Sequence, residues 1–418
     1  MHIFFSGIGG AGIGPLALIA KQAGYTVSGS DKQDSDYVSY LLKKGVNNIQ
    51  IGQTSAQIAE IHAKEPIDWV VYSSAVEKEN PKGHPEIIFA RENGIRQSKR
   101  DEFLSELLIQ KHKKLIAVAG THGKTTTTAM VVWAFKQLGM PISYSVGAKL
   151  DFGEMGEFDE DSKYFVYEAD EYDRNFLSFS PEISIISGID YDHADIYPTR
   201  EIYYQAFVEF ICQSNDVFAH TEDLERIGMA ADDESLVSTS DFTLVGEVNR
   251  KNAQLVTEML LTITNKPISE LVHILNDFPG VSRRFEKISE NIYSDYAHTP
   301  EKIRGALQIA EEISDRIVVV YEGLHNTRQH FIRDELDNLF EDTKKLYIVP
   351  SYLAREDESL EMLTPEKLCE IVREPADREP AQLDDNLKKS IAEHVNKGDL
   401  VLCLSAGGGG SLDEWLRR

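Results

Sequence analysis

The sequence predicts an α/β protein of three domains, and three observations support this prediction. Short apolar runs alternate with segments of helical periodicity, which is typical of parallel sheets covered by helices. Glycine-rich turns follow the apolar runs that end at Ser6, Ala119 and Ser405. The chain of 418 residues is too long for one small domain. The expected domains cover residues 1–107, 108–279 and 280–418.

The first domain is expected to alternate strands and helices. Its apolar runs predict strands at 2–7, 25–31 and 68–75. Its helical segments are 15–24 and 98–114, and the second of these runs into a basic linker. This order predicts a parallel sheet with helices on its faces.

The second and third domains repeat the alternation. In the second, strands are expected at 115–119, 164–170 and 182–190, and helices at 200–213, 252–263 and 268–278. The stretch 151–163 between them is acidic and contains glycine, which predicts a surface loop. In the third, strands are expected at 291–297, 316–323, 344–351 and 399–407, with a helix at 300–313.

Charge and composition exclude several classes of protein. The 43 Lys and Arg residues are outnumbered by 69 Asp and Glu residues, which gives a net charge of −26 and argues against a nucleic-acid binder. No apolar stretch is long enough for a membrane helix, and the first residues lack the pattern of a signal peptide. The three cysteines form no CxxC pair, which favours a reducing, cytoplasmic compartment. A small substrate carrying phosphate is not excluded, because a local pocket can oppose the global charge.

The strongest local motif is a phosphate-binding loop at residues 115–128. A buried strand leads into Gly120 and Gly123, whose turn can direct backbone N–H groups at an anion. Lys124 can reach the outer phosphates of a nucleotide, and the hydroxyl of Thr125 can bind Mg²⁺. The first glycine of the usual pattern is replaced by Val118. A plain turn between strand and helix is the alternative.

Acidic residues follow the next two expected strands. Glu168, Asp170, Glu171 and Asp173 follow one strand, and the segment 190–195 with His193 follows the other. Ligands of open α/β sheets bind at the carboxyl ends of strands, and carboxylates beside a phosphate loop suit Mg²⁺. Solvated loop charges remain an alternative for most of these acids.

A second glycine-rich loop lies near the N-terminus. Gly7, Gly9 and Gly12 form G-x-G-x-x-G between a strand and a helix, and Asp31 ends the next strand. The motif indicates a nucleotide or another diphosphate, and a dehydrogenase is the alternative that it leaves open. Two phosphate loops on one chain favour two nucleotides.

In the third domain, Arg283, Arg284, Asp295, Tyr296 and His298 lie close in sequence, and the segment 322–330 adds His325 and Arg328. Arginine binds phosphate or carboxylate through two hydrogen bonds. Surface arginine pairs are common, so these residues alone do not define a site.

In their order along the chain, these motifs resemble the Mur ligases, ATP-dependent enzymes that form amide bonds in peptidoglycan precursor synthesis. The resemblance covers nearly the whole chain and is carried by "GIGGAGIGPLA", "GSD", "SSAVEKENP", "AGTHGKTTTTAM", "EADE", "DHADIY", "GEVNRKNA", "FPGVSRRFE", "DYAHTPE", "YLARE" and "SAGGGG". It implies a Rossmann-like UDP-binding first domain, a central domain of the P-loop ATPase type and a Rossmann-like third domain.

Carried over by position, the resemblance implies a role for each matching residue. Residues implied at ATP are Gly120, Thr121, His122, Gly123, Lys124, Thr125, Thr126, Asn249, Asn252, Arg284 and Asp295. Those implied at a UDP-sugar are Gly9, Gly10, Gly12, Ser30, Asp31 and Ser73. Thr125, Glu168 and His193 are implied to bind Mg²⁺, and the implied catalytic residues are Lys124, His193, His298 and Arg328.

The chain departs from the family pattern at several points. Val248 replaces an expected His, and "DYAHTP" resembles members that add later residues more than the alanine-adding branch. The link between His193 and Gly246 looks short, which predicts that a hairpin of the central domain is missing. The helix at 201–213 has no Lys, so the carbamylated lysine of some relatives is not expected.

The resemblance implies an ATP-dependent, ADP-forming ligase. Such an enzyme would join L-alanine to the carboxylate of UDP-N-acetylmuramate through an acyl phosphate, with ATP and Mg²⁺. One alternative is the recycling ligase that adds a murein tripeptide to the same UDP-sugar. Another is an inactive, ligase-like nucleotide-binding protein. The oligomeric state does not follow from the sequence.

Overall fold

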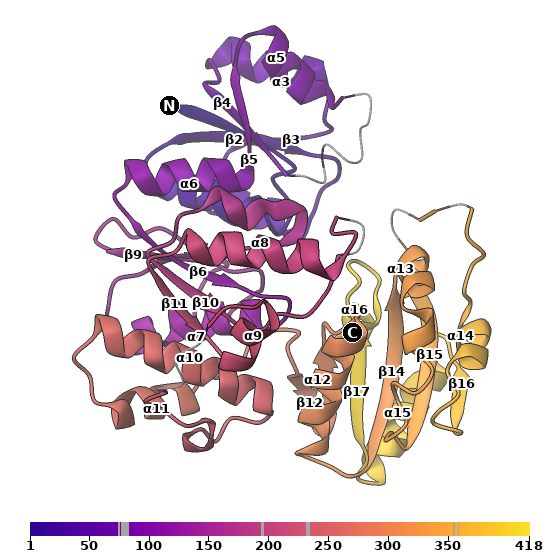
Figure 1. The fold of residues 1–418 in the computed structure, drawn as a ribbon. Coiled ribbons are helices and arrows are strands. Elements are labelled where there is room, and N and C mark those ends of the chain that lie inside the picture. Colours follow the sequence, from indigo (N-terminus) through magenta and orange to yellow (C-terminus); the bar gives the residue numbers. More distant parts are fainter. Residues whose placement is uncertain (74–75, 77–82, 194–195, 231–234, 354–355, 358) are drawn as a thin grey trace. The chain divides into compact units, whose positions relative to one another are not determined.

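A computed structural model describes residues 1–73, 76, 83–193, 196–230, 235–353, 356–357 and 359–418. The chain has the three-domain α/β architecture that the sequence predicts, with one sheet in each domain. These domains form two compact units. Residues 1–242 and 252–278 make the first unit, and residues 243–251 and 279–418 make the second (Figure 1). The domain boundaries at 107/108 and 279/280 stay a prediction. Most of the "SSAVEKENP" segment and parts of "DHADIY" and "YLARE" lie outside the described residues.

The first sheet is wholly parallel, with the order β3-β2-β1-β4-β5. Its strands are β1 (His2–Ser6), β2 (Thr26–Asp31), β3 (Asn48–Ile51), β4 (Trp69–Tyr72) and β5 (Arg96–Lys99). Its helices are α1 (Gly14–Gln22), α2 (Asp36–Lys43), α3 (Ser55–Lys64), α5 (Pro85–Glu92) and α6 (Arg100–Gln110). The aromatic ring of Phe103 on α6 meets Phe5 and Trp69 edge-on, which fixes α6 on the sheet. The predicted strands and helices are confirmed here. Sequence reasoning missed the strands β3 and β5 and the helices α2, α3 and α5.

The second sheet has the order β11-β10-β6-β9-β7-β8. Its strands are β6 (Lys114–Ala119), β7 (Ser143–Ser145), β8 (Gly156–Glu157), β9 (Tyr164–Glu168), β10 (Ile183–Ile186) and β11 (Asp216–Ala219). Its helices are α7 (Lys124–Gln137), α8 (Arg200–Cys212), α9 (Thr221–Arg226), α10 (Glu247–Ile263) and α11 (Ile268–Asn276). In Figure 1, α8 lies on one side of this sheet and α7 and α10 on the other. Phe210 of α8 stacks on Phe176 with 4.7 Å between ring centroids.

The expectation of a surface loop at 151–163 is wrong in part. The segment contains the edge strand β8, which pairs antiparallel with β7. Gly156 lies against Pro15 of α1, where a Cβ atom would approach the Pro15 carbonyl to 3.0 Å. Glu154 accepts a hydrogen bond from Lys44, and Glu157 pairs with Lys136 at 3.0 Å. Glu154 therefore contacts the end of α2 in the first domain, and Glu157 contacts α7 of its own domain, which composition alone did not reveal.

In the described part of the link between His193 and Gly246 there is one strand, β11. The described residues of this link form α8, β11, α9 and a short 3-10 helix at Thr239–Asp241, and they include no strand hairpin. The helix α10 begins at Glu247, five residues before the start expected from periodicity. Asn249 and Asn252 therefore both lie on a helix and not in a loop.

The third sheet has the order β12-β13-β17-β14-β15-β16 and is parallel except for the pair β12–β13. Its strands are β12 (Glu286–Ser289), β13 (Ile292–Asp295), β14 (Ile317–Leu324), β15 (Lys345–Tyr352), β16 (Arg378–Pro380) and β17 (Leu400–Ser405). Its helices are α12 (Pro300–Glu311), α13 (Asn326–Phe331), α14 (Pro365–Ile371), α15 (Asp385–Asn396) and α16 (Leu412–Leu416). The predicted strands are confirmed, while the two edge strands, β12 and β16, were not expected.

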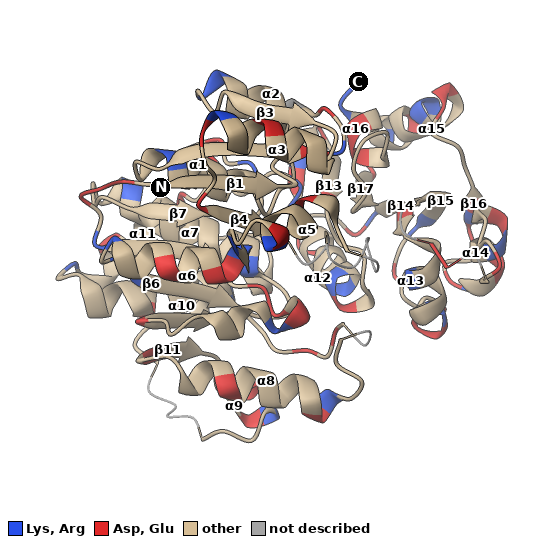
Figure 2. Ribbon diagram, turned by 90° about the horizontal axis from the view of Figure 1, so that it is seen from above, with Lys and Arg blue, Asp and Glu red and all other residues tan. Residues whose placement is uncertain are grey.

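Part of the acidic charge lies on helices. Figure 2 shows acidic positions along α6, α8 and α9. Among the described residues, no helix is both long and apolar enough to span a membrane.

Candidate active site

The phosphate loop joins β6 to α7 at the carboxyl edge of the second sheet. Gly123 is the N-cap of α7 with φ 77°, a conformation that side chains disfavour. Lys124 and Thr125 form the first turn of α7, with Thr126 directly after them. The end of a strand, a glycine turn and the N-terminus of a helix thus meet at one place. Such a place binds anions, because the first N–H groups of a helix have no partner within the helix.

Lys124 is held by a buried carboxylate. Its ammonium donates to Glu171 Oε2 at 2.7 Å and to the Gly120 carbonyl at 2.5 Å. The Glu171 side chain is 1 % exposed, and its Oε1 lies 3.3 Å from His193 Nε2. Glu171 is thus placed between two of the predicted catalytic residues. It was one of several acids in the sequence and was not singled out there.

The charges at this point are set by burial and by the neighbouring ions. Burial favours the neutral form of Glu171, but Lys124 and His193 outweigh it and hold the pKa of Glu171 at about 2. Burial, followed by the charge of Glu171, raises the pKa of Asp170 above its ordinary value. Burial opposes the charge of Lys124, yet Glu171 and Asp170 raise the pKa of the ammonium. Glu171 and Lys124 therefore form an ion pair, in which Glu171 is buried and the Lys124 side chain is 14 % exposed.

The oxygen atoms of Thr125 and Glu168 suit a magnesium ion. The Thr125 hydroxyl donates to Glu168 Oε1 at 2.9 Å, and the Gly147 amide donates to Glu168 Oε2 at 3.0 Å. Mg²⁺ prefers hard oxygen donors and commonly takes one or two from protein and the rest from phosphates and water. In the described part of the chain, no three His, Cys, Asp or Glu side chains gather to hold a metal ion. This pair therefore fits Mg²⁺ only in company with a nucleotide.

Two side chains beside the loop, the buried Asn252 and the half-buried His193, are among those whose buried polar atoms have no hydrogen-bond partner in the described residues. Both amide atoms of Asn252 are in this state, and the residue is 1 % exposed. A Cβ atom on Gly123 would lie 3.1 Å from them, so Asn252 adjoins the phosphate loop. The other is His193 Nδ1. Because leaving buried polar atoms unpaired is costly, both observations support a polar ligand here.

The side chains of Thr121 and His122 attach the phosphate loop to the segment that follows β10. The Thr121 hydroxyl donates to the Asp190 carbonyl at 2.6 Å. His122 Nε2 lies 2.9 Å from Asp190 Oδ2, and a Cβ atom on Gly188 would lie 2.1 Å from the His122 ring. Thr121 and His122 thus fix the loop through their side chains.

The N-terminal glycine loop lies at the carboxyl edge of the first sheet. The Gly9 amide donates to Asp31 Oδ2 at 2.8 Å, and the Gly10 amide donates to the Gly7 carbonyl at 3.0 Å. Because β4 neighbours β1, Ser73 directly after β4 lies at this same edge. The structure therefore brings the predicted UDP-sugar residues to one edge. Gly12 contacts Arg100, a residue that sequence reasoning did not select.

A buried acid connects β1 and β2 below this loop. Glu86 is 0 % exposed and accepts hydrogen bonds from Ser6 at 2.6 Å and Ser30 at 2.5 Å. Ser30 is itself 1 % exposed, and its hydroxyl donates to a buried acid in the protein interior. Burial raises the pKa of Glu86 from 4.5 to about 7.

We expect Glu86 to make stability depend on pH between about 4.5 and 7. The folded protein keeps the proton that the unfolded chain loses in this range, so stability should fall as pH rises. The loss should be on the order of 3 kcal/mol, since each pKa unit corresponds to about 1.4 kcal/mol. Urea unfolding of wild type and Glu86→Gln at pH 5 and pH 8 tests this. Glu86→Gln should lose this part of the pH dependence, and an unchanged dependence would contradict the assignment.

In the second unit, three of the predicted residues surround Tyr296. The guanidinium of Arg284 lies 4.7 Å from the Tyr296 ring centroid, and the His298 ring meets it edge-on at 5.3 Å. Asp295 accepts hydrogen bonds from the Phe285 and Ala297 amides, both at 2.7 Å. This cluster lies at the carboxyl end of β13.

The other predicted residues of this unit lie on different elements. Arg328 is on α13, which follows β14. Asn249 is in the first turn of α10, where its side chain donates to the Val245 carbonyl at 2.8 Å. Val248 precedes it on the same turn and is half-buried.

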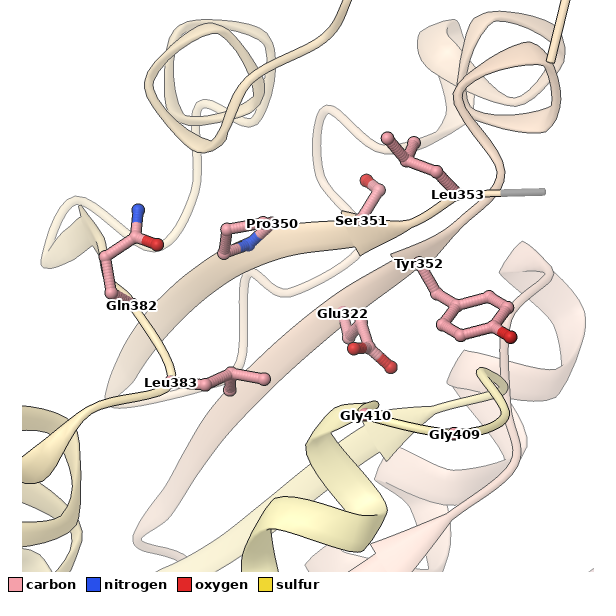
Figure 3. Close-up of a pocket in the computed structure, with 9 residues that line it drawn as sticks. All are labelled: Glu322, Pro350, Ser351, Tyr352, Leu353, Gln382, Leu383, Gly409 and Gly410. Atoms are coloured by element: carbon pink, nitrogen blue, oxygen red, sulfur yellow. The ribbon is translucent and has the colours of Figure 1, made fainter.

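A pocket of about 540 Å³ lies at the carboxyl ends of β14 and β15 (Figure 3). Glu322, Tyr352 and the glycines 409–410 are among its lining residues. Glu322 accepts hydrogen bonds from Ser405 at 2.6 Å and from the Leu412 amide at 3.0 Å. The glycine-rich segment after β17 thus borders a cavity, which composition could not show.

The phosphate loop lies at the edge of one of three sheets and carries the Lys124–Glu171 ion pair. This arrangement defines a nucleotide-binding enzyme of the P-loop type. Family models match three successive parts of the chain. They are "Mur ligase family, catalytic domain" at residues 2–112, "Mur ligase middle domain" at 118–258 and "Mur ligase, glutamate ligase domain" at 283–407. The chain belongs to the Mur ligase family.

The similar proteins cover nearly all of the chain. The UDP-N-acetylmuramate–L-alanine ligase of Acetivibrio thermocellus is 30% identical over 97% of this chain and 93% of its own. The enzyme of that name from Geotalea daltonii is 32% identical over 97% and 95%. Two crystal structures share the fold at 24% identity. The UDP-N-acetylmuramate-alanine ligase of Thermotoga maritima has a TM-score of 0.74 and covers 100% of this chain and 98% of its own. A murein peptide ligase of Psychrobacter arcticus has a TM-score of 0.66 and covers 98% and 96%.

Proposed function

We propose that this protein joins L-alanine to the carboxylate of UDP-N-acetylmuramate, coupled to cleavage of ATP to ADP and phosphate. The observation that carries the proposal is the phosphate loop, where Lys124 is held beside Glu171 and Thr125 beside Glu168. The choice of L-alanine rests on the relatives at 30% and 32% identity, which carry that enzyme's name. The cytoplasm is the proposed compartment, since ATP and nucleotide sugars are found there.

The proposed reaction has two steps. The muramate carboxylate attacks the γ-phosphate of ATP, which gives an acyl phosphate and releases ADP. The amine of L-alanine then attacks the acyl carbon, and phosphate leaves as the amide bond forms. The first step brings anions together, so its transition state needs positive charge at the phosphates. Lys124 and the N-terminus of α7 provide that charge in this chain.

Mg²⁺ would add further charge between the phosphates when bound. Thr125 and Glu168 are the proposed ligands, and His193 is the proposed residue at a second ion. Arg284, Asp295, Asn249 and Asn252 are proposed at ATP. His298 and Arg328 are proposed at the amino acid or the acyl phosphate.

The recycling ligase is the second candidate, because the murein peptide ligase shares the fold over the whole chain. The two enzymes use the same UDP-sugar and differ in the amine. The named relatives favour L-alanine. An inactive, ligase-like protein would be free to lose Lys124, Thr125 and Glu168, and the chain retains all three.

We expect phosphate release from ATP only when UDP-N-acetylmuramate and an amine are both present. The measurement is phosphate released per minute with L-alanine, L-serine, glycine or the murein tripeptide as the amine. L-Alanine should give the highest kcat/KM. A higher value with the tripeptide would favour the recycling ligase, and equal release without any amine would contradict the ligase assignment.

A further inference from the structure

Arg100, the first residue of α6, lies against the N-terminal glycine loop. A Cβ atom on Gly12 would lie 1.9 Å from Arg100 Nη1 and 3.2 Å from its Cζ. The guanidinium therefore packs on the backbone of Gly12, and any side chain at that position would displace it. The contact brings a cation to the loop that the sequence identified as a diphosphate site.

The guanidinium is held in place by two acids. Arg100 Nε donates to Asp101 Oδ2 at 3.1 Å, and Nη2 donates to Asp170 Oδ2 at 3.4 Å. Asp101 is fixed in turn by the Tyr167 hydroxyl, which donates to its Oδ1 at 2.6 Å. Burial disfavours the charged form of Arg100. Tyr167, Asp101 and Asp170 outweigh this effect and raise the pKa of the guanidinium. The side chain is thus an oriented cation, and it is 19 % exposed.

The glycine loop needs such a cation to bind a diphosphate. The carboxylate of Asp31 already accepts a hydrogen bond from Gly9 in this loop, and the whole chain carries a charge of −26. The N-terminal N–H groups of α1 supply only a fraction of a positive charge. A guanidinium has five N–H donors in a planar fork that matches phosphate oxygens. Arg100 can therefore offset the acidic surroundings where the anion would bind.

We propose that Arg100 binds the diphosphate of the UDP-sugar at the Gly7–Gly12 loop. The inference rests on the proposed function, because that function supplies the nucleotide sugar. Arg100 also bonds to Asp170, whose neighbour Glu171 holds Lys124. The same contact thus connects the UDP-sugar loop with the ATP loop.

The competing interpretation is a structural role, with Arg100 only tying α6 to the end of β9. The preceding residue provides a matched control. Lys99 pairs with Asp173 at 2.8 Å, so it joins the same two segments by an ion pair of its own. If the segments only need to be tied together, Lys99→Ala and Arg100→Ala should have similar effects.

The test is calorimetric titration of the full-length protein with UDP and with uridine, which lacks the phosphates. Wild type, Arg100→Ala, Arg100→Lys and Lys99→Ala are compared. We expect Arg100→Ala to weaken UDP binding about 10- to 100-fold and to change uridine binding less than about twofold. Arg100→Lys should be intermediate, because a point charge cannot bind in the bidentate way. Lys99→Ala should bind UDP like wild type.

The outcomes separate this inference from the proposed function. Wild type that binds no UDP would contradict the proposed function itself. If wild type binds UDP, equal UDP affinity in Arg100→Ala or Arg100→Lys would overturn the role of Arg100. An equal loss for UDP and uridine would also overturn it, because that pattern indicates a disturbed fold. In steady-state assays, the KM for UDP-N-acetylmuramate should rise in Arg100→Lys while the KM for ATP stays within about twofold.

Discussion

Lys124→Ala is expected to lower kcat by about a thousandfold or more while leaving UDP binding intact. The ammonium lies at the N-terminus of α7 beside Thr125, where the outer phosphates of ATP would bind. A positioned cation acts on charge that develops in the transition state, so its loss affects the chemical step most strongly. UDP would bind at the edge of the first sheet, on residues that Lys124 does not contact. The measurements are phosphate release and calorimetric titration with UDP.

Lys136→Ala is the matched control for this variant. Lys136 lies on the same helix and pairs with Glu157 at 3.0 Å, far along α7 from the phosphate loop. The kcat of Lys136→Ala should stay within about twofold of wild type, because partly exposed ion pairs contribute little to stability and this one lies away from the phosphate loop. Loss of both activity and UDP binding in Lys124→Ala would contradict the assignment of the two nucleotides to separate loops.

The phosphate loop could be predicted because its residues are adjacent in sequence. Gly123, Lys124 and Thr125 must follow one another to form a helix N-terminus, so the motif itself specifies the local geometry. Glu168 could be predicted for a related reason. It ends a strand, and β9 pairs directly with β6, so its side chain lies at the same edge of the sheet.

Residues that act across long sequence separations could not be predicted in this way. Arg100 meets Gly12 through the packing of α6 on the first sheet, and nothing in the local sequence specifies that contact. Glu86 stands at the end of a polar stretch of the sequence, yet it is 0 % exposed and accepts hydrogen bonds from two serines. The strand β8 was missed for a different reason. It is only two residues long, and its acidic neighbours gave the segment the composition of a loop.

Glu171→Ala is expected to destabilise the first unit by about 3 kcal/mol, because it leaves the largely enclosed Lys124, 14 % exposed, without its carboxylate partner. The charge of Glu171 also predicts a pH dependence. Its pKa is held at about 2, below the ordinary value of 4.5. The pair's contribution should therefore be complete above pH 4.5 and be lost as pH falls toward 2. Urea unfolding of wild type and Glu171→Gln between pH 6 and pH 3 should show this loss in wild type alone.

A double-mutant cycle separates the pair from the fold around it. Glu171→Gln removes the carboxylate beside Lys124, and Lys124→Met removes the ammonium beside Glu171, whereas the double variant leaves neither charge of the pair. The double variant should therefore be more stable than the sum of the two single losses predicts, by about 1 to 3 kcal/mol. Additive losses would mean that Lys124 and Glu171 do not interact in solution. The double variant should still lack ligase activity, because restoring stability does not restore the cation at the phosphates.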